Sequence, residues 1–194
     1  IRRGNKSQFA STQEHRQRIV NLIKDYRTLL GQGVVARFDP ETYSDAVAFA
    51  RIGEGSLGGK ARGLAFMNSM ILKHRLYDKH ANVRIMIPRS VVIATDYFDD
   101  FIRLNGLKYI ISQEFSDEEI LSEFVSSTVP ARLQQELKAY IQTVRTPLAV
   151  RSSSKLEDSH YQPFAGIYST YMIPYVDNGD QMLRLLLKAV KSVY

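Results

Sequence analysis

A cluster of glycines that leads into a long helical pattern is the feature that most constrains how this chain can fold. This glycine-rich segment (residues 53–60) reads Gly-Glu-Gly-Ser-Leu-Gly-Gly-Lys. Apolar residues then recur at helical spacing, at Leu57, Ala61, Leu64, Met67, Ile71, Leu72 and Leu76. Glycines let backbone approach a ligand closely, and the unpaired N–H groups at a helix N-terminus attract anions. The segment therefore predicts a phosphate-binding loop, to which Lys60 would add a full positive charge.

Two common nucleotide-binding loops fit this segment poorly. A Walker A loop is excluded because Glu54 stands where its first glycine is needed and Ala61 replaces the hydroxyl residue that holds magnesium. The dinucleotide pattern G-x-G-x-x-G is matched, but that fold also needs a strand directly before the glycines and an acidic residue at the end of the next strand. Asp78 is near the required spacing, yet it precedes the strand expected at 83–87. The dinucleotide interpretation is therefore weak.

A second segment combines an apolar strand with an arginine and three hydroxyl groups. This Arg-Ser segment (residues 148–154) reads Leu-Ala-Val-Arg-Ser-Ser-Ser, and a polar loop then leads to Phe-Ala-Gly at 164–166. Arginine offers a planar fork of donors that suits phosphate, and serines add donors without crowding. The alternative is an ion pair of Arg151 with Glu157 or Asp158, and this segment alone favours that alternative.

Taken together, the motifs resemble the N-terminal nucleotide-binding part of phosphoenolpyruvate synthase and pyruvate phosphate dikinase. That family carries G-G-K-G-A-N-L, then V-P-P-G-F-V-V-T-T, then V-R-S-S-A-T-A-E-D-L-P-D-A-S-F-A-G. This chain has similar stretches in the same order, at 58–64, 87–95 and 150–166, the last without a gap. The resemblance covers about residues 52–194 and is far more specific than either glycine pattern alone.

The resemblance implies a set of residues that bind the nucleotide. These are Gly58, Gly59, Lys60, Arg151, Ser152, Ser153, Phe164, Ala165 and Gly166. Lys60 and Arg151 would be the phosphate-binding cations that serve catalysis. The glycines would allow close approach, the two serines would donate to phosphate oxygens, and residues 164–166 would form a mobile lid. We expect Glu157 and Asp158 to support the loop rather than to bind metal.

The sequence departs from the family at several positions. Arg62 and Gly63 replace a small residue and an asparagine, and Arg89 and Ser90 replace a proline and a glycine. The family's L-P-D-A-S becomes the bulkier Ser-His-Tyr-Gln-Pro at 159–163. The phosphate-facing positions are kept, so the departures bear on the phosphoryl acceptor and on whether the site is active or degenerate.

Composition and charge narrow the class of protein. The 194 residues are 44% hydrophobic and include no cysteine, so the chain can bury a core and has no disulfides or thiolate metal site. No apolar run approaches the roughly 18 residues of a membrane span, and no signal peptide is evident, so we expect a soluble, cytoplasmic protein. The net charge of +6 lies mostly in residues 1–30, which suits a solvated helix face rather than a nucleic-acid groove.

The predicted class is α+β, helix-rich with a small sheet, and the resemblance implies the first lobe of an ATP-grasp-type domain. Residues 1–33 are expected to be a helical connector and 34–194 the N-terminal part of the nucleotide-binding domain. We expect helices at about 40–49, 57–79, 95–105, 116–125, 130–144 and from 179 onward, and strands at 83–87, 90–94, 147–151 and 167–173. Local signals mark several helix ends: Asn105-Gly106 closes one helix, Ser116 and Glu119 form a capping box, Pro130 suits a first turn, and Asp177-Asn178-Gly179 starts the last helix.

The resemblance implies an ATP-dependent dikinase that phosphorylates a carrier histidine and thence pyruvate, which gives phosphoenolpyruvate. None of the four histidines lies in the T-S-H context of the carrier, and the chain ends within a helical pattern. We therefore expect a fragment that is inactive alone, binds ATP weakly at most, and lacks the carrier histidine, the Mg²⁺ ligands and the pyruvate site. The longer parent protein could form a homodimer. The alternatives are a related dikinase or phosphotransferase with another acceptor, or a non-catalytic nucleotide-binding module, and water or phosphate could take the second phosphoryl group.

Overall fold

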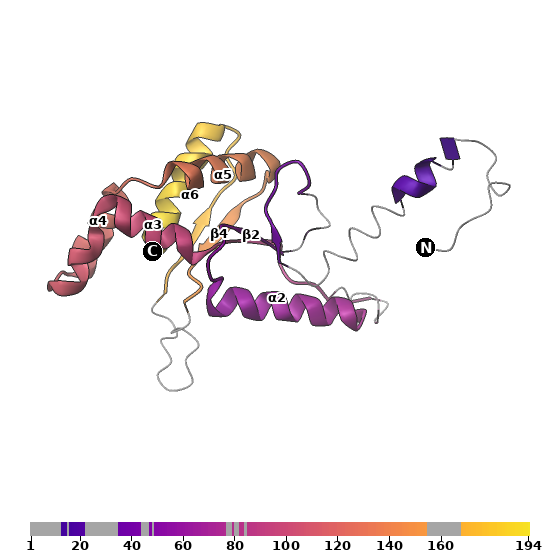
Figure 1. Cartoon of the computed structure of the whole chain (residues 1–194), viewed down its shortest axis with the longest axis horizontal. Helices are drawn as coiled ribbons and strands as arrows, with labels where there is room; N and C mark the ends of the chain where they lie inside the picture. Colours follow the sequence, from indigo (N-terminus) through magenta and orange to yellow (C-terminus); the bar gives the residue numbers. More distant parts are fainter. Residues whose placement is uncertain are drawn as a thin grey trace.

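The computed structural model describes residues 13–14, 16–21, 35–43, 47, 49–76, 79, 82–83, 85–154 and 168–194. Helical residues at 13–14 and 16–21 precede the main body (Figure 1). The strands are β1 (Ala36–Arg37), β2 (Phe49–Ile52), β3 (Ser90–Ile93), β4 (Leu148–Arg151) and β5 (Thr170–Ile173). The helices are α2 (Gly58–Lys73), α3 (Thr95–Asn105), the 3-10 helix η3 (Leu107–Ser112), α4 (Asp117–Ser126), α5 (Ala131–Thr143) and α6 (Gly179–Val193). This mixture of helices with small sheets agrees with the α+β expectation.

A three-stranded parallel sheet, in the order β1-β2-β3, supports the first half of the body. Ala36 pairs with Ala50, and Ala50 pairs with Val91, so all three strands end at the same edge. The helix α2 connects β2 to β3. Alternate residues of the strands pack on opposite faces, since Phe49 and Val92 belong to the apolar cluster with α2, whereas Ala50 and Val91 belong to the larger core.

The two strands before the glycine-rich segment were not predicted. The short helix expected through Phe49 is wrong at that residue, because Phe49 begins β2. The residues of β2 are buried on both faces, as in parallel sheets, so no alternation of apolar and polar residues marks the strand. A short apolar run of this kind cannot be distinguished from a buried helical turn by periodicity.

The region between α2 and β3 also differs from the expectation. The helix α2 ends at Lys73 rather than near residue 79, and Arg75 adopts the left-handed φ of 51°. At the strand expected over 83–87, Val83 forms only an isolated bridge and 85–87 are not in a strand. Ile87 is nevertheless buried, packed with Phe49 and Ala61 beneath α2. Its apolar character serves side-chain packing, and β3 begins only at Ser90.

Local capping signals predicted the other helices well. The capping box between Ser116 and Glu119 is present at α4, and Asn178 Oδ1 accepts the Gln181 N–H at α6. Gly106, with φ 65°, ends α3. Pro130 is the N-cap of α5 rather than a residue of its first turn. These contacts lie within four residues along the chain, which is why the sequence reveals them.

The second sheet is an antiparallel pair, in which Leu148 of β4 faces Ile173 of β5 and Arg151 faces Thr170. It agrees with the expected pair of strands, although residue 167, where the second was expected to begin, lies outside the described residues. In Figure 1, α2 lies on one side of the labelled strands and α5 and α6 lie on the other.

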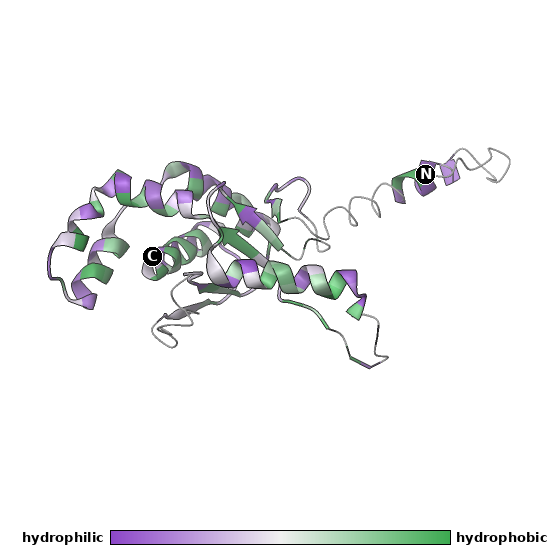
Figure 2. Ribbon diagram, turned by 60° about the horizontal axis from the view of Figure 1, so that its bottom comes forward, coloured by the Kyte–Doolittle hydropathy of each residue, from purple (hydrophilic) through white to green (hydrophobic). Residues whose placement is uncertain are grey.

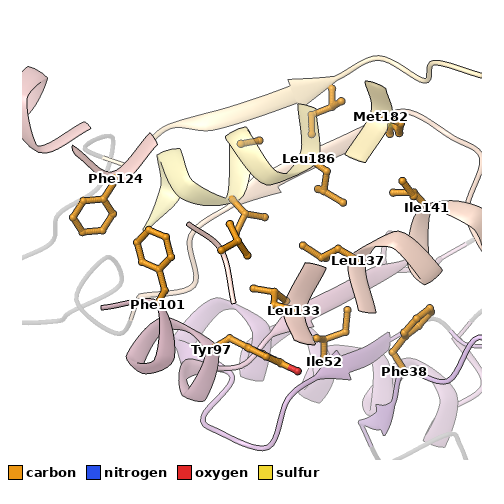
Figure 3. Close-up of a cluster of buried hydrophobic side chains, with 14 of the residues drawn as sticks. Phe38, Ile52, Tyr97, Phe101, Phe124, Leu133, Leu137, Ile141, Met182 and Leu186 are labelled. Atoms are coloured by element: carbon orange, nitrogen blue, oxygen red, sulfur yellow. The ribbon is translucent and has the colours of Figure 1, made fainter. Parts of the chain in front are cut away.

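The main core lies between the sheets and the helices α3, α5 and α6. Its most buried members include Val190. Figure 3 labels three others, Ile52, Phe101 and Leu133. Figure 2 shows hydrophobic colouring concentrated on the central strands and on the helix that ends at the C-terminus. Within the part of the chain that the structure describes, every helix is too short or too polar to span a lipid bilayer.

Candidate functional site

The candidate site lies where β2 and β3 end at the same edge of the parallel sheet. The glycine-rich segment follows Ile52 of β2, and Thr95 and Asp96 follow β3. The Ala94 N–H donates to Ile52 O (2.9 Å), so the two connections leave the sheet side by side. Ligands of parallel sheets bind at this carboxyl edge.

The first half of the glycine-rich segment is bound by side chains from the start of α3. The backbone N–H groups of Glu54 and Gly55 donate to Asp96 Oδ2 (2.9 Å) and Oδ1 (3.0 Å). The Ser56 N–H donates to Thr95 Oγ1 (3.0 Å), and the Thr95 N–H donates back to Ser56 O (3.0 Å). We call this set of contacts the Thr95–Asp96 clamp.

Two glycines make room for this clamp. A Cβ on Gly53, whose φ is 93°, would lie 2.5 Å from Asp96 Oδ1. A Cβ on Gly55 would lie 2.6 Å from the backbone nitrogen of Asp96. Both distances are too short for a side chain, so the glycines are required by the contact with α3.

The environment of Asp96 favours its ionised form. Burial acts to raise the pKa of the Asp96 carboxyl group, but hydrogen bonds from the backbone N–H groups of Glu54 and Gly55 lower it. The net pKa lies below the ordinary value of 3.8. Near neutral pH, the loop is therefore held by a carboxylate, which accepts stronger hydrogen bonds than a neutral group does.

The second half of the glycine-rich segment is bound by Ser153 of the Arg-Ser segment. Ser153 O accepts the Gly59 N–H (3.1 Å). Ser153 Oγ accepts the Ala61 N–H (3.0 Å) and donates to Leu57 O (2.8 Å). A Cβ on Gly58, whose φ is 76°, would lie 1.7 Å from Ser153 O. This set, the Ser153 clamp, brings together two motifs that lie about 90 residues apart in the sequence.

The Ser153 clamp specifies what three of the expected site residues do in this structure. The close approach at Gly58 is made by the backbone of Ser153, and Gly59 gives its N–H to the same residue. The only proton of the Ser153 hydroxyl goes to Leu57 O. Ser153 is therefore occupied in joining the motifs, so donation to a phosphate would require that bond to break.

The two expected phosphate-binding cations, Lys60 and Arg151, lie close in the sequence to the residues of the Ser153 clamp. Lys60 follows Gly59 in the first turn of α2 and is partly buried, whereas Arg151 ends β4 and is exposed. Ser152, next to Arg151, is partly buried. That the two cationic side chains converge on one nucleotide stays a prediction. Phe164, Ala165 and Gly166, and with them Glu157 and Asp158, lie outside the described residues.

The backbone donors of the glycine-rich segment are largely used within the protein. The N–H groups of residues 54, 55, 56, 59 and 61 donate to the two clamps, and the Gly58 N–H points to Ser56 Oγ at 3.4 Å. In this structure the glycines serve contacts between segments of the chain. An anion at the start of α2 would therefore rely chiefly on cationic side chains rather than on a cradle of N–H groups.

A charged network borders the site, and sequence reasoning missed it. Arg51 pairs with Glu54 (2.7 Å) and donates to Gly53 O (3.2 Å). Arg37 lies 3.6 Å from both Glu54 and Glu136. Both arginines are on β1 or β2, so recognising these strands would have placed them beside the glycines.

Tyr97 joins this network from α3. Its hydroxyl donates to Glu136 Oε1 (2.9 Å), and burial together with the Glu136 carboxylate raises the pKa of Tyr97 to about 12. It therefore stays a neutral donor at physiological pH. Within the described part of the chain, no group of three or more acidic or histidine side chains could hold a metal ion.

Comparison with known proteins identifies a family. The model of the family described as the pyruvate phosphate dikinase, AMP/ATP-binding domain, matches residues 54–194. The matched range begins within the glycine-rich segment and includes both clamps. No curated protein and no solved structure matches the chain.

Proposed function

The chain belongs to the family of pyruvate phosphate dikinase AMP/ATP-binding domains, and from this premise we propose that it binds the ATP of a phosphoenolpyruvate synthase or pyruvate phosphate dikinase-like enzyme. The observation that carries the proposal is the Ser153 clamp. It joins the lysine-bearing start of α2 to the arginine-bearing end of β4, the two places where the family's phosphate-binding motifs lie.

In the proposed mechanism, two cationic residues stabilise negative charge on the phosphates. Lys60 and Arg151 bind the phosphates and offset the negative charge that builds on them as the terminal group leaves. The contacts of Ser153 with Gly58 and Gly59 fix the position of Lys60 relative to Arg151. Ser152 donates a hydrogen bond to a phosphate oxygen. Residues 164–166 cover the nucleotide. Phosphoryl transfer needs little covalent help from such a site, so positioning and charge suffice.

The remaining chemistry belongs to other parts of the parent protein. Magnesium accompanies ATP in this class of reaction, and its acidic ligands would come from outside the described residues, among which no group of three or more acidic or histidine side chains could hold a metal ion. We further propose that a carrier histidine on another domain accepts the phosphoryl group and passes it to pyruvate. Residues 34–194 would form the first part of an ATP-grasp-type domain, with 1–33 as a helical connector.

The loss of catalysis through the sequence departures is the competing interpretation, and the positions of the departures weaken it. Arg89 precedes β3 at the amino edge of the parallel sheet, opposite the edge from which the glycine-rich segment leaves. Arg62 is exposed on α2. Neither replaces a residue of the two clamps. Release of AMP from ATP that depends on pyruvate would favour the proposed enzyme over a binding module or a relative with another acceptor.

Substitution of the two cations tests the proposal. In the full-length protein, Lys60→Ala and Arg151→Ala should each lower ATP-dependent turnover by about 10²–10³, the usual scale for losing one preorganised charge donor. Lys73→Ala and Arg145→Ala are the matched controls, because both remove an exposed positive charge away from the clamps. Unchanged turnover in both site variants, with normal folding, would remove these cations from the site.

A further inference from the structure

We propose that Asp96 and Thr95 are positioning residues of the nucleotide site, which fix the backbone of residues 53–56 and thereby set where the start of α2 presents Lys60. The inference rests on the proposed ATP-binding function and extends it to residues that touch no part of the nucleotide themselves. Neither residue belongs to the set of phosphate-binding positions that the sequence indicated.

The contacts are numerous and directed at a single short loop. Three successive N–H groups, those of residues 54, 55 and 56, all donate to side-chain oxygens of Asp96 or Thr95 at 2.9–3.0 Å. The acceptors lie 39–42 residues further along the chain. A loop whose consecutive donors are all directed to one neighbour has its backbone direction fixed at each residue.

These two side chains bind the loop, and hydrogen bonds from the N–H groups of Asp96 and Tyr97 at the helix start also lower the pKa of the Asp96 carboxyl group. Thr95 and Asp96 are the first two residues of α3, and the N-cap position is held by Ala94, whose methyl group cannot accept a hydrogen bond. Serine, threonine and aspartate at a helix start commonly bind that helix's own N–H groups. Here both side chains reach across to the end of β2, which indicates a role in shaping the glycine-rich segment.

Glycine occurs where the clamp needs space. The Cβ positions of Gly53 and Gly55 are occupied by Asp96 and Thr95 atoms at 2.5–2.7 Å. Between this loop and Lys60 lie only three residues, 57–59, of which the last two already belong to α2. A shift of the loop therefore moves the first turn of α2, and the charge of Lys60 with it.

The consequence concerns nucleotide affinity more than folding. A loop that is ordered before ATP arrives does not lose conformational freedom on binding, so weakening the clamp should weaken binding. Asp96→Asn is nearly isosteric and replaces one accepting oxygen with an NH₂ group that repels the loop's N–H donors. We expect ATP to bind about tenfold more weakly in this variant.

The test compares ATP affinity with backbone and stability readouts in the full-length protein. Asp96→Asn should raise the Kd for ATP and shift the amide NMR signals of Glu54 and Gly55, whereas Asp99→Asn, on the exposed side of the same helix, should change neither. Thr95→Val, which removes the acceptor, should weaken ATP binding, and Thr95→Ser, which keeps it, should restore affinity. Thermal unfolding without ATP confirms that each variant is folded at the assay temperature.

Each outcome supports or overturns a distinct claim. Shifted amide signals with an unchanged Kd in Asp96→Asn would overturn the positioning role and leave the ATP-binding function standing. Equal affinities for Thr95→Val and Thr95→Ser would also overturn it. Absence of ATP binding by the unsubstituted protein would overturn the proposed function and, with it, the inference that depends on it.

Discussion

The two clamps hold the same glycine-rich segment by different means. The Thr95–Asp96 clamp joins neighbouring strands of one sheet, and its central group is a carboxylate that accepts two N–H groups. The Ser153 clamp joins the parallel sheet's helix to the strand pair β4–β5, and its contacts are neutral. The first is therefore sensitive to charge, whereas the second depends on close packing of backbone against backbone.

The difference explains why glycines at three positions are not equivalent. A Cβ on Gly53 would meet the Asp96 carboxylate, whose rotatable bonds allow it to shift, and a Cβ on Gly55 would lie 2.6 Å from the backbone nitrogen of Asp96. Gly58 faces the carbonyl of Ser153, which can move only with its backbone. We therefore expect the Ser153 clamp to tolerate added volume less than the Thr95–Asp96 clamp does.

The largest effect is expected from Gly58→Ala. The new Cβ would lie 1.7 Å from Ser153 O in a residue whose φ of 76° already disfavours side chains. We expect the free energy of unfolding, measured by urea denaturation, to fall by about 3 kcal/mol or more. Gly63→Ala is the control, because its Cβ would meet no atom of the described residues within 4 Å, and there alanine should stabilise α2 by about 0.5–1 kcal/mol. Similar stabilities for the two variants would refute the packing role of the Ser153 clamp.

A smaller loss is expected from Ser153→Ala, which keeps the backbone contact to Gly59 and removes the hydroxyl. The Ala61 N–H would lose its acceptor and Leu57 O its donor. Unfolding by urea should show a loss of about 1–3 kcal/mol. Ser126→Ala removes an exposed hydroxyl that bonds within α4, and should change stability by less than about 0.5 kcal/mol. If Ser153→Ala lowered the free energy of unfolding no more than Ser126→Ala does, the contacts of the Ser153 hydroxyl would not contribute to stability.

The sequence predicted the parts of the fold that depend on neighbours along the chain. The capping box at Ser116 and Glu119, the glycine that ends α3 and the asparagine that begins α6 all act within one helical turn. β1 and β2 were missed because a two- or four-residue strand in a parallel sheet carries too little pattern to identify. The strand expected at 83–87 is absent at 85–87, where Ile87 packs beneath α2 instead of pairing in a sheet.

The candidate site likewise has a part that the sequence predicted and a part that it could not predict. The sequence placed a glycine-rich segment before a helix and an arginine at a strand end, and the structure has α2 beginning at Gly58 and β4 ending at Arg151. The sequence could not show that Ser153 and Asp96 accept the segment's N–H groups, because acceptor and donor lie 39–92 residues apart and the donors are backbone groups. Such pairs leave no periodic or spacing signal in a single sequence.

Acid should distinguish the clamps. Because the folded-state pKa of Asp96 is below its ordinary value of 3.8, the ionised carboxylate contributes stability that is fully present above the unfolded-state pKa. That contribution is lost as the pH falls through the still lower folded-state pKa. The stability difference between the unsubstituted protein and Asp96→Asn should therefore be constant near neutral pH and shrink below about pH 4. The effect of Ser153→Ala should not change through this window, since its contacts do not titrate.

Thermal unfolding from pH 7 to pH 2.5 measures both differences, with Asp99→Asn as the control for a carboxylate on the same helix. A gap between the unsubstituted protein and Asp96→Asn that stays the same down to pH 2.5 would show that the carboxylate's charge is unimportant to its clamp. A gap for Ser153→Ala that varied in parallel would show that the two clamps act as one unit.

The smallest effect is expected from the ion pair that flanks the Thr95–Asp96 clamp. Arg51 pairs with Glu54 at 2.7 Å, but the Glu54 side chain is 57% exposed, so water and salt weaken the attraction. A double-mutant cycle of Arg51→Ala and Glu54→Ala should give a coupling energy of about 0.2–1 kcal/mol that falls at high salt. The exposed pair of Arg103 and Asp100 is the reference, and it should couple no more strongly. A coupling energy well above 1 kcal/mol would mean that Glu54 is held from both sides, by its backbone through Asp96 and by its side chain through Arg51, and that the clamp extends beyond the α3 residues to β2 itself.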